Sequence, residues 1–186
     1  HKLHGPKGMG ALYVRKGTKL ITFMHGGGQE RGRRASTENV PGIVGFAKAA
    51  EIARQELEEE AKRITALRDK LIKGITGRIT DVRVNGHPTK RLPNNVNVSF
   101  RFVEGESMLL NLDLEGIAAS TGSACSSGSL EPSHVLLAMR FSHEDAHGSL
   151  RFSFGRDNTE QDVDRVLEVL PPIVAKLRAM SPLVKK

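Results

Sequence analysis

The stretch PGIVGFAKAAEIARQELEEEAKRITALRDKLIKGIT, residues 41–76, carries the longest helical pattern in this 186-residue chain. Its apolar residues keep a spacing that places them along one face of a helix. Pro41 suits the first turn of a helix, and either Thr37 or Asn39 can cap it. The sequence therefore predicts one long helix over these residues, or two helices with a bend near Gln55.

Shorter elements are expected on both sides of this helix. Residues 11–15 and 20–24 alternate like two strands joined by a turn at Gly17, and residues 25–34 read as a glycine-rich basic loop. After the helix, the patterns predict strands at 82–84, 95–102, 117–119 and 150–154 and helices at 106–114, 132–139 and from 160 toward 180, the last one capped by Thr159 and kinked or split by Pro171 and Pro172. This mixture predicts an α/β fold class, with a small α+β domain from about residue 78 onward.

Composition limits the classes of function. The chain has 38% hydrophobic and 26% charged residues, which is typical of a globular protein. No apolar run reaches the roughly 18 residues of a membrane span. The net charge of +7 would suit a nucleic acid, but the basic residues are scattered and aromatic residues make up only 4%. The chain begins at His1 rather than at methionine, so we expect the C-terminal part of a longer polypeptide.

Cys125 is the only cysteine, which excludes a disulfide within the chain. It lies in STGSACSSGS, residues 120–129, a stretch too small and polar to form a core. A buried cysteine usually sits in an apolar pattern, so a thiol in such a loop favours reactivity over packing. A reducing, cytosol-like compartment fits this usage.

Two other segments match known chemistries. HEDAH, residues 143–147, has the letters of an HExxH zinc motif, but it is followed at once by Gly148, and two solvated histidines are the simpler interpretation. The basic loop at 25–34 could cradle a phosphate through its backbone amides, or it could be a flexible surface loop. Ser36 and Thr37 at a helix N-terminus add hydroxyl donors for an anion.

Two basic residues lie in suggestive settings. Lys2, beside His1 and close to several glycines, can form a Schiff base if a carbonyl cofactor is near. Arg151 stands between apolar residues on a predicted strand, where an arginine either completes a buried ion pair or binds a carboxylate.

These segments together resemble a known family. His1-Lys2 followed by HGPKG, then GGGQERGRRAST, NNVNVSF, STGSACSSGSLEPSHVL and HGSLRFSFGR, occur in the order and spacing of the C-terminal half of NifS/IscS-type cysteine desulfurases, which are class-V aminotransferases. The resemblance implies the C-terminal part of a fold-type I transferase dependent on pyridoxal 5'-phosphate (PLP). Residues 1–77 would be the remnant of the large PLP-binding domain with the long connecting helix. Residues 78–186 would be the small domain that carries the cysteine loop at 120–131.

The resemblance also implies roles for individual residues. Lys2 resembles the lysine that holds PLP covalently, and His1 the neighbour that contacts the cofactor. Thr37 resembles the threonine that reaches the phosphate of PLP in the partner subunit of a homodimer. Arg151 resembles the arginine that binds the substrate carboxylate, and Cys125 the nucleophile that becomes a persulfide.

The implied activity is conversion of L-cysteine to L-alanine, with the sulfur transferred to Cys125 and then to an acceptor for iron-sulfur cluster or thio-cofactor assembly in the cytoplasm. The persulfide of Cys125 could contact an iron-sulfur cluster in a complex with a scaffold protein, but no intrinsic metal site is expected. Related alternatives are a selenocysteine lyase and a cysteine sulfinate desulfinase. Remote alternatives are an HExxH zinc hydrolase at His143 and His147 and a basic RNA-binding module.

The chain departs from the family pattern at two positions. Ser36 stands where the family often has glycine, and Arg140 replaces a glycine that usually follows the alanine-methionine pair. Because the remaining cofactor contacts would belong to the N-terminal half, we expect the fragment alone to be inactive.

Overall fold

The computed structural model describes residues 1–121 and 132–182. The chain divides into two compact units, His1–Glu58 and Glu59–Lys186. The division falls within helix α1 (Val40–Arg78), so the second half of this helix belongs to the packing of the second unit. A domain boundary near residue 78 stays a prediction.

Helix α1 is continuous over its 39 residues, as one of the two predicted forms requires. Its cap is Asn39, because the backbone N–H of Gly42 donates to Asn39 Oδ1 at 3.1 Å. An asparagine oxygen at this position satisfies one of the amides that have no partner within the helix. The prediction of a capped helix is confirmed, and Asn39 is the residue that provides the cap.

The strands predicted at 11–15 and 20–24 are wrong. These residues have no regular structure, although the turn between them forms, with Thr18 N–H donating to Arg15 O at 3.1 Å and Gly17 at φ 88°. An isolated two-stranded hairpin is only marginally stable, and no further strand of the described residues pairs with it. The first unit contains instead a two-residue antiparallel pair, β1 (Gly28–Gln29) and β2 (Arg34–Ala35).

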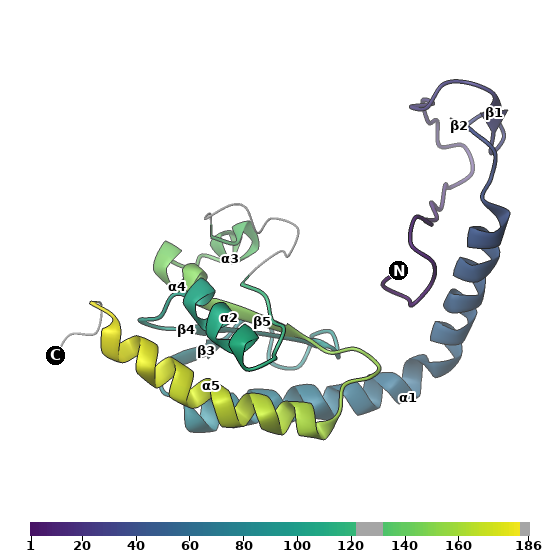
Figure 1. The fold of residues 1–186 in the computed structure, drawn as a ribbon. Coiled ribbons are helices and arrows are strands. Elements are labelled where there is room, and N and C mark those ends of the chain that lie inside the picture. Colours follow the sequence, from purple (N-terminus) through teal and green to yellow (C-terminus); the bar gives the residue numbers. More distant parts are fainter. Residues whose placement is uncertain (122–131, 183–186) are drawn as a thin grey trace. The chain divides into compact units, whose positions relative to one another are not determined.

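The second unit is built on an antiparallel sheet of three strands in the order β3 (Val82–Val84), β4 (Asn95–Phe100) and β5 (Ser149–Ser153). Figure 1 shows this sheet above α5 (Glu160–Met180) and the second half of α1. The strand residues alternate between two faces. The apolar side chains of one face, with those of α1, α2 (Gly105–Leu114) and α5, form the core: Ile64, Leu67, Leu71, Ile75, Val96, Val98, Phe100, Met108, Leu112, Leu150, Phe152, Val163, Leu167, Leu170 and Val174 are buried members.

Helix α5 begins as predicted at Thr159, whose side chain accepts from Asp162 N–H while the Asp162 carboxylate accepts from Thr159 N–H. The predicted split at the proline pair is wrong, since the helix continues to Met180, and a kink there stays a prediction. Pro171 has no N–H to donate to the carbonyl of Leu167 four residues earlier. Arg78 Nη1 donates to that carbonyl instead, at 2.8 Å, so α1 satisfies the acceptor that the proline leaves open.

The opposite face of the sheet carries polar side chains and is partly covered by two short helices. These are α3 (His134–Ala138) and α4 (His143–His147). Leu136 of α3, Ala146 of α4 and Phe141 between the two helices are buried and form a second small cluster. The guanidinium of Arg83 on β3 lies 3.9 Å from the centroid of the Phe141 ring. The strand predicted at residues 117–119 is wrong, since these residues have no regular structure, and the next residue, Ser120, makes an isolated antiparallel bridge with Arg151.

None of the helices in the described ranges is long and apolar enough to cross a membrane.

Candidate functional site

The N-terminal segment of the first unit lies against the beginning of α1. A Cβ atom on Gly45 would come within 2.7 Å of the Pro6 ring, and one on Gly42 within 2.5 Å of Met9 Sδ, so these glycines let the segment approach the helix closely. The segment includes His1 and Lys2, and both side chains are exposed. Lys2 is therefore accessible to a ligand.

Thr37 is exposed and lies three residues before the first residue of α1. Ser36, just before it, has φ 78°, a left-handed conformation that favours glycine. Ser36 thus adopts a conformation typical of glycine, and the chain enters Thr37 from this turn. Within the described residues, no hydrogen bond or salt bridge joins Thr37 to His1 or Lys2.

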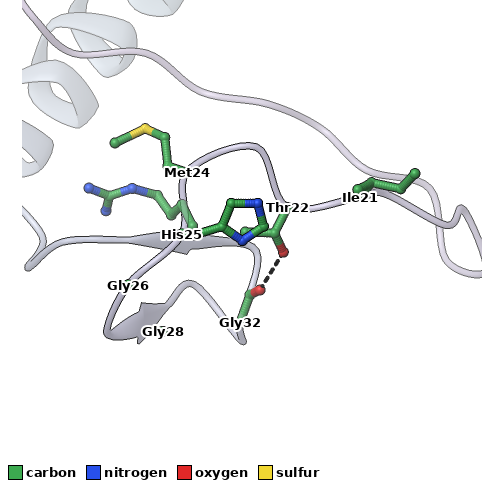
Figure 2. A pocket seen from close by; sticks show the side chains of 8 residues that line it. Ile21, Thr22, Met24, His25, Gly26, Gly28 and Gly32 are labelled. Carbon is green, nitrogen blue, oxygen red and sulfur yellow. Dashed lines mark hydrogen bonds between the residues drawn. The ribbon is translucent and has the colours of Figure 1, made fainter.

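The segment predicted as a phosphate-binding loop surrounds a hollow. Figure 2 shows this hollow and the hydrogen bond from Thr22 Oγ1 to the carbonyl of Gly32, 3.0 Å long, which ties its two sides together. Its lining residues are Ile21, Thr22, Met24, His25, Gly26, Gly28, Gly32 and Arg34. Backbone at Gly26, Glu30, Arg31 and Gly32 has positive φ, so the chain turns sharply around the hollow. A phosphate-binding role for residues 25–34 stays a prediction.

The available groups in the first unit fit PLP chemically. A primary amine can form an imine with its aldehyde, and a hydroxyl next to a helix N-terminus suits its phosphate. Lys2 provides the amine and Thr37 the hydroxyl, and both are exposed to a ligand.

Arg151 is on β5, on the polar face of the sheet, and its side chain is half-buried. Its Nε atom is buried and has no hydrogen-bond partner within the described part of the chain. A buried N–H without an acceptor is unfavourable by about 1–3 kcal/mol unless a ligand or water accepts from it. The sequence left two interpretations open for Arg151, a buried ion pair or the binding of a carboxylate. The described residues contain no ion pair of Arg151, so the structure agrees with the second interpretation.

Arg151 is also bonded to the start of the cysteine segment. Its backbone N–H donates to Ser120 O at 2.6 Å and its carbonyl accepts from Ser120 N–H at 3.1 Å. Cys125 itself, with most of the predicted loop at 120–131, lies outside the described residues. The structure therefore places the anchor of the segment opposite Arg151 and leaves the assignment of Cys125 as a prediction.

Sequence analysis did not single out Asn97, which lies directly opposite Arg151 on β4. The alternation of NVNVSF places this asparagine on the polar face of its strand. Only the register between β4 and β5 reveals its neighbour, and a single sequence does not contain that register.

The HEDAH segment forms the one-turn helix α4, with both histidines exposed. Ser142 Oγ stabilises this short helix by accepting from Asp145 N–H at 3.0 Å. A search of residues 1–121 and 132–182 finds no group of three or more His, Cys, Asp or Glu side chains that could hold a metal ion. The described residues do not provide the third ligand of a zinc hydrolase.

Comparisons with known proteins agree on one family. The model of the class-V aminotransferases matches residues 1–166. The chain is 62% identical over 186 residues to "Cysteine desulfurase IscS" of Methanosarcina thermophila, covering all of this chain and 46% of that protein. It is 60% identical over 182 residues to "Cysteine desulfurase" of Gluconacetobacter diazotrophicus, again covering 46% of the relative. The chain thus spans about half the length of the curated relatives it matches.

Solved structures give the same result for the fold. A NifS-like protein superposes with a TM-score of 0.83 at 41% identity, over 95% of this chain and 45% of that one. A NifS-like protein from Rickettsia africae superposes with a TM-score of 0.75 at 28% identity, over 85% of this chain and 41% of that one. The predicted fold class, a part of a fold-type I α/β transferase, is confirmed, and so is the resemblance to cysteine desulfurases.

Proposed function

Because this chain belongs to the class-V aminotransferase family, a family of PLP-dependent enzymes, we propose that the whole polypeptide is a cysteine desulfurase. The observation that carries the proposal is the 62% identity over the full chain with a protein of that name. The reaction converts L-cysteine and the thiol of Cys125 into L-alanine and a persulfide on Cys125. The sulfur then passes to an acceptor protein.

Each site residue has a defined task in this reaction. Lys2 holds the cofactor through its ε-amine and moves the proton at the Cα atom of the substrate. Arg151 binds the substrate carboxylate with charge-assisted hydrogen bonds, and its Nε–H, which has no partner within residues 1–121 and 132–182, is one of the donors. PLP, when bound, withdraws electron density from the Cα atom of the substrate.

Cys125 is assigned the nucleophilic step. Its thiolate attacks the substrate sulfur, the bond between that sulfur and Cβ breaks, and Cβ takes a proton to give alanine. The covalent chain keeps the Cα atom of Cys125 within about 18 Å of that of Ser120, since five peptide bonds connect the two residues. Because Ser120 is paired with Arg151, this limit supports a nucleophile that acts on a substrate held at Arg151.

The proposal extends to the partners. His1 contacts the cofactor, and Thr37 binds the phosphate of PLP in the second subunit of a homodimer, so that each site needs both chains. The exposure of the Thr37 hydroxyl supports this role. An iron-sulfur scaffold or another cytoplasmic sulfur acceptor receives the sulfur from Cys125.

The test uses the whole polypeptide, including the residues that its relatives have before this segment. With L-cysteine as substrate, we expect the wild-type protein to show a visible PLP absorbance band and to form alanine. Lys2→Ala should lose both the band and the activity. Cys125→Ser should keep the band and lose alanine formation.

The pair of variants separates cofactor binding from sulfur transfer. Cys125→Ser is the matched control for Lys2→Ala, because it leaves the amine in place. If Cys125→Ser turned over L-cysteine at the wild-type rate, the assigned nucleophile would be wrong.

A further inference from the structure

We propose that Asn97 provides a second hydrogen-bond donor, beside Arg151, for the carboxylate of the amino acid substrate, and that Asn85 holds the Asn97 amide in the required orientation. This inference rests on the proposed function, because it concerns the same substrate. It adds two residues that neither the sequence motifs nor the resemblance assigns.

The backbone hydrogen bonds determine how Asn97 and Arg151 face each other. The N–H and C=O of Arg151 both bond to Ser120, on the side of β5 away from β4. The C=O of Asn97 accepts from Asn85 N–H at 2.8 Å, on the side of β4 away from β5. Asn97 and Arg151, which are direct partners in the register, are therefore a pair without hydrogen bonds between them.

This type of pair brings two side chains closest together. In an antiparallel sheet, the Cα atoms of such a pair are about 4.5 Å apart, and directly opposite side chains project from the same face. The side chains of Asn97 and Arg151 thus leave the polar face from directly opposite positions. A carboxylate has two oxygens and can accept from one donor of each side chain.

The orientation of the Asn97 amide is fixed by its other neighbour. Asn85 Nδ2 donates to Asn97 Oδ1 at 2.5 Å and to Ser99 Oγ at 2.9 Å. Since the oxygen of Asn97 is occupied by a donor, its nitrogen is the group that remains for a ligand. In the described part of the chain, the Asn97 nitrogen donates to no acceptor, and the residue is only half-buried.

Asn85 is itself held firmly enough to act as a positioning residue. It is 4% exposed, and its carbonyl accepts from Arg91 Nη2 at 2.8 Å. Among the residues that the structure describes, the Asn97 amide nitrogen and the Nε–H of Arg151 on the opposite strand are therefore two donors without a protein acceptor. A bound carboxylate supplies the acceptors that these two donors lack.

The experiment measures inhibition of L-cysteine turnover by two probes in the whole PLP-loaded polypeptide. L-Alanine carries the carboxylate, and ethylamine is the same molecule without it. For Asn97→Ala, we expect the inhibition constant of L-alanine to rise about tenfold and that of ethylamine to stay within about twofold. Asn97→Asp keeps the shape and the bond from Asn85 but turns the donor into an anion, so the rise for L-alanine should reach about a hundredfold.

Two further variants complete the set. Asn85→Ala should raise the inhibition constant of L-alanine by a smaller factor, about threefold, because the Asn97 amide is then free to turn. Asn95→Ala is the matched control, since Asn95 lies on the same strand and face but opposite Ser153, and it should change neither constant.

An equal change for L-alanine and ethylamine in Asn97→Ala and Asn97→Asp would overturn the inference, because the position would then act through the sheet alone. Arg151→Gln tests the proposed function separately. If Arg151→Gln left L-alanine binding unchanged, the carboxylate site itself would be misassigned. A loss with Arg151→Gln but none with Asn97→Asp would refute only the role of Asn97.

Discussion

The two units of this chain differ in what they bury. Unit Glu59–Lys186 encloses a core to which three strands and three helices contribute, and several of its side chains, such as Leu71 and Leu170, are 1% exposed or less. Within unit His1–Glu58, Ala35 is the only hydrophobic side chain that is buried. Large apolar residues of this unit are in solvent instead: Leu12, Tyr13, Ile21 and Phe23 are 78%, 88%, 97% and 94% exposed.

This difference indicates which unit needs contacts with further protein to bury its apolar side chains. Contiguous exposed apolar residues usually mark a surface that another element covers. The relatives are about twice as long as this chain, so the first unit is expected to complete its packing only in the whole polypeptide. Lys2 and Thr37, to which we assign cofactor binding as a proposal, lie in this dependent unit, whereas Arg151 lies in the unit with its own core.

The largest effect should come from a cavity in the core of the second unit. Leu71 is 1% exposed, and Leu71→Ala should lower the free energy of unfolding by about 3 kcal/mol, through lost burial and the cavity that remains. Phe23→Ala in the first unit removes a larger side chain and should change this free energy by less than about 0.5 kcal/mol. Urea unfolding of the chain, followed by circular dichroism, measures both. A loss of similar size for Phe23→Ala would show that the first unit has a core of its own.

The same difference explains which elements were predictable from sequence. Local signals gave the strand at Val82–Val84 and the start of α5 at Thr159, because alternation and capping act within a few residues. The hairpin at residues 11–24 was mispredicted because an alternating sequence forms a strand only when another strand pairs with it. The split at the proline pair was mispredicted, and Arg78, far away in sequence, donates to the carbonyl of Leu167 that Pro171 leaves without a donor.

Only those residues of the candidate site that lie in a recognisable sequence motif could be predicted from the sequence. The motifs and the family resemblance pointed to Arg151, but only the folded structure shows that its Nε is buried without an acceptor among the described residues. Asn97 gave no signal, because its significance depends on which residue of β5 lies opposite. Registers and buried partners are properties of the tertiary structure, and no local pattern encodes them.

Two glycines of α1, Gly74 and Gly77, differ in how closely other side chains pack against them. A Cβ atom on Gly74 would lie 2.4 Å from Leu167 Cδ1, a buried side chain of α5, whereas nothing lies within 4 Å of a Cβ on Gly77. Gly74→Ala should therefore destabilise the second unit by about 1–2 kcal/mol through overpacking. Gly77→Ala, the matched control three residues later, should stabilise it by up to about 1 kcal/mol, because alanine favours the helix. The same unfolding experiment measures both, and a loss for both variants would mean that the glycines serve the helix rather than the contact with α5.

The smallest effect concerns the two departures from the family pattern, one in each unit. Arg140 has φ 64° and follows α3 in a Schellman motif, in which Phe141 N–H donates to Leu136 O at 3.1 Å and Arg140 N–H to Leu137 O at 2.9 Å. Ser36 has φ 78°. Both therefore occupy conformations that glycine adopts without strain, which accounts for the glycine that the family often has there.

Arg140→Gly should stabilise the second unit by about 1 kcal/mol, since the left-handed conformation costs a non-glycine residue about that much. Ser36→Gly relieves similar strain, but it lies in the unit without a core, so the unfolding curve of this chain should not move by more than about 0.3 kcal/mol. In the whole polypeptide, where the first unit is packed, both substitutions should raise the melting temperature. Equal stabilisation by the two substitutions in this chain alone would mean that both units unfold as one cooperative structure. The two units would then differ in how much apolar surface they bury but not in their stability.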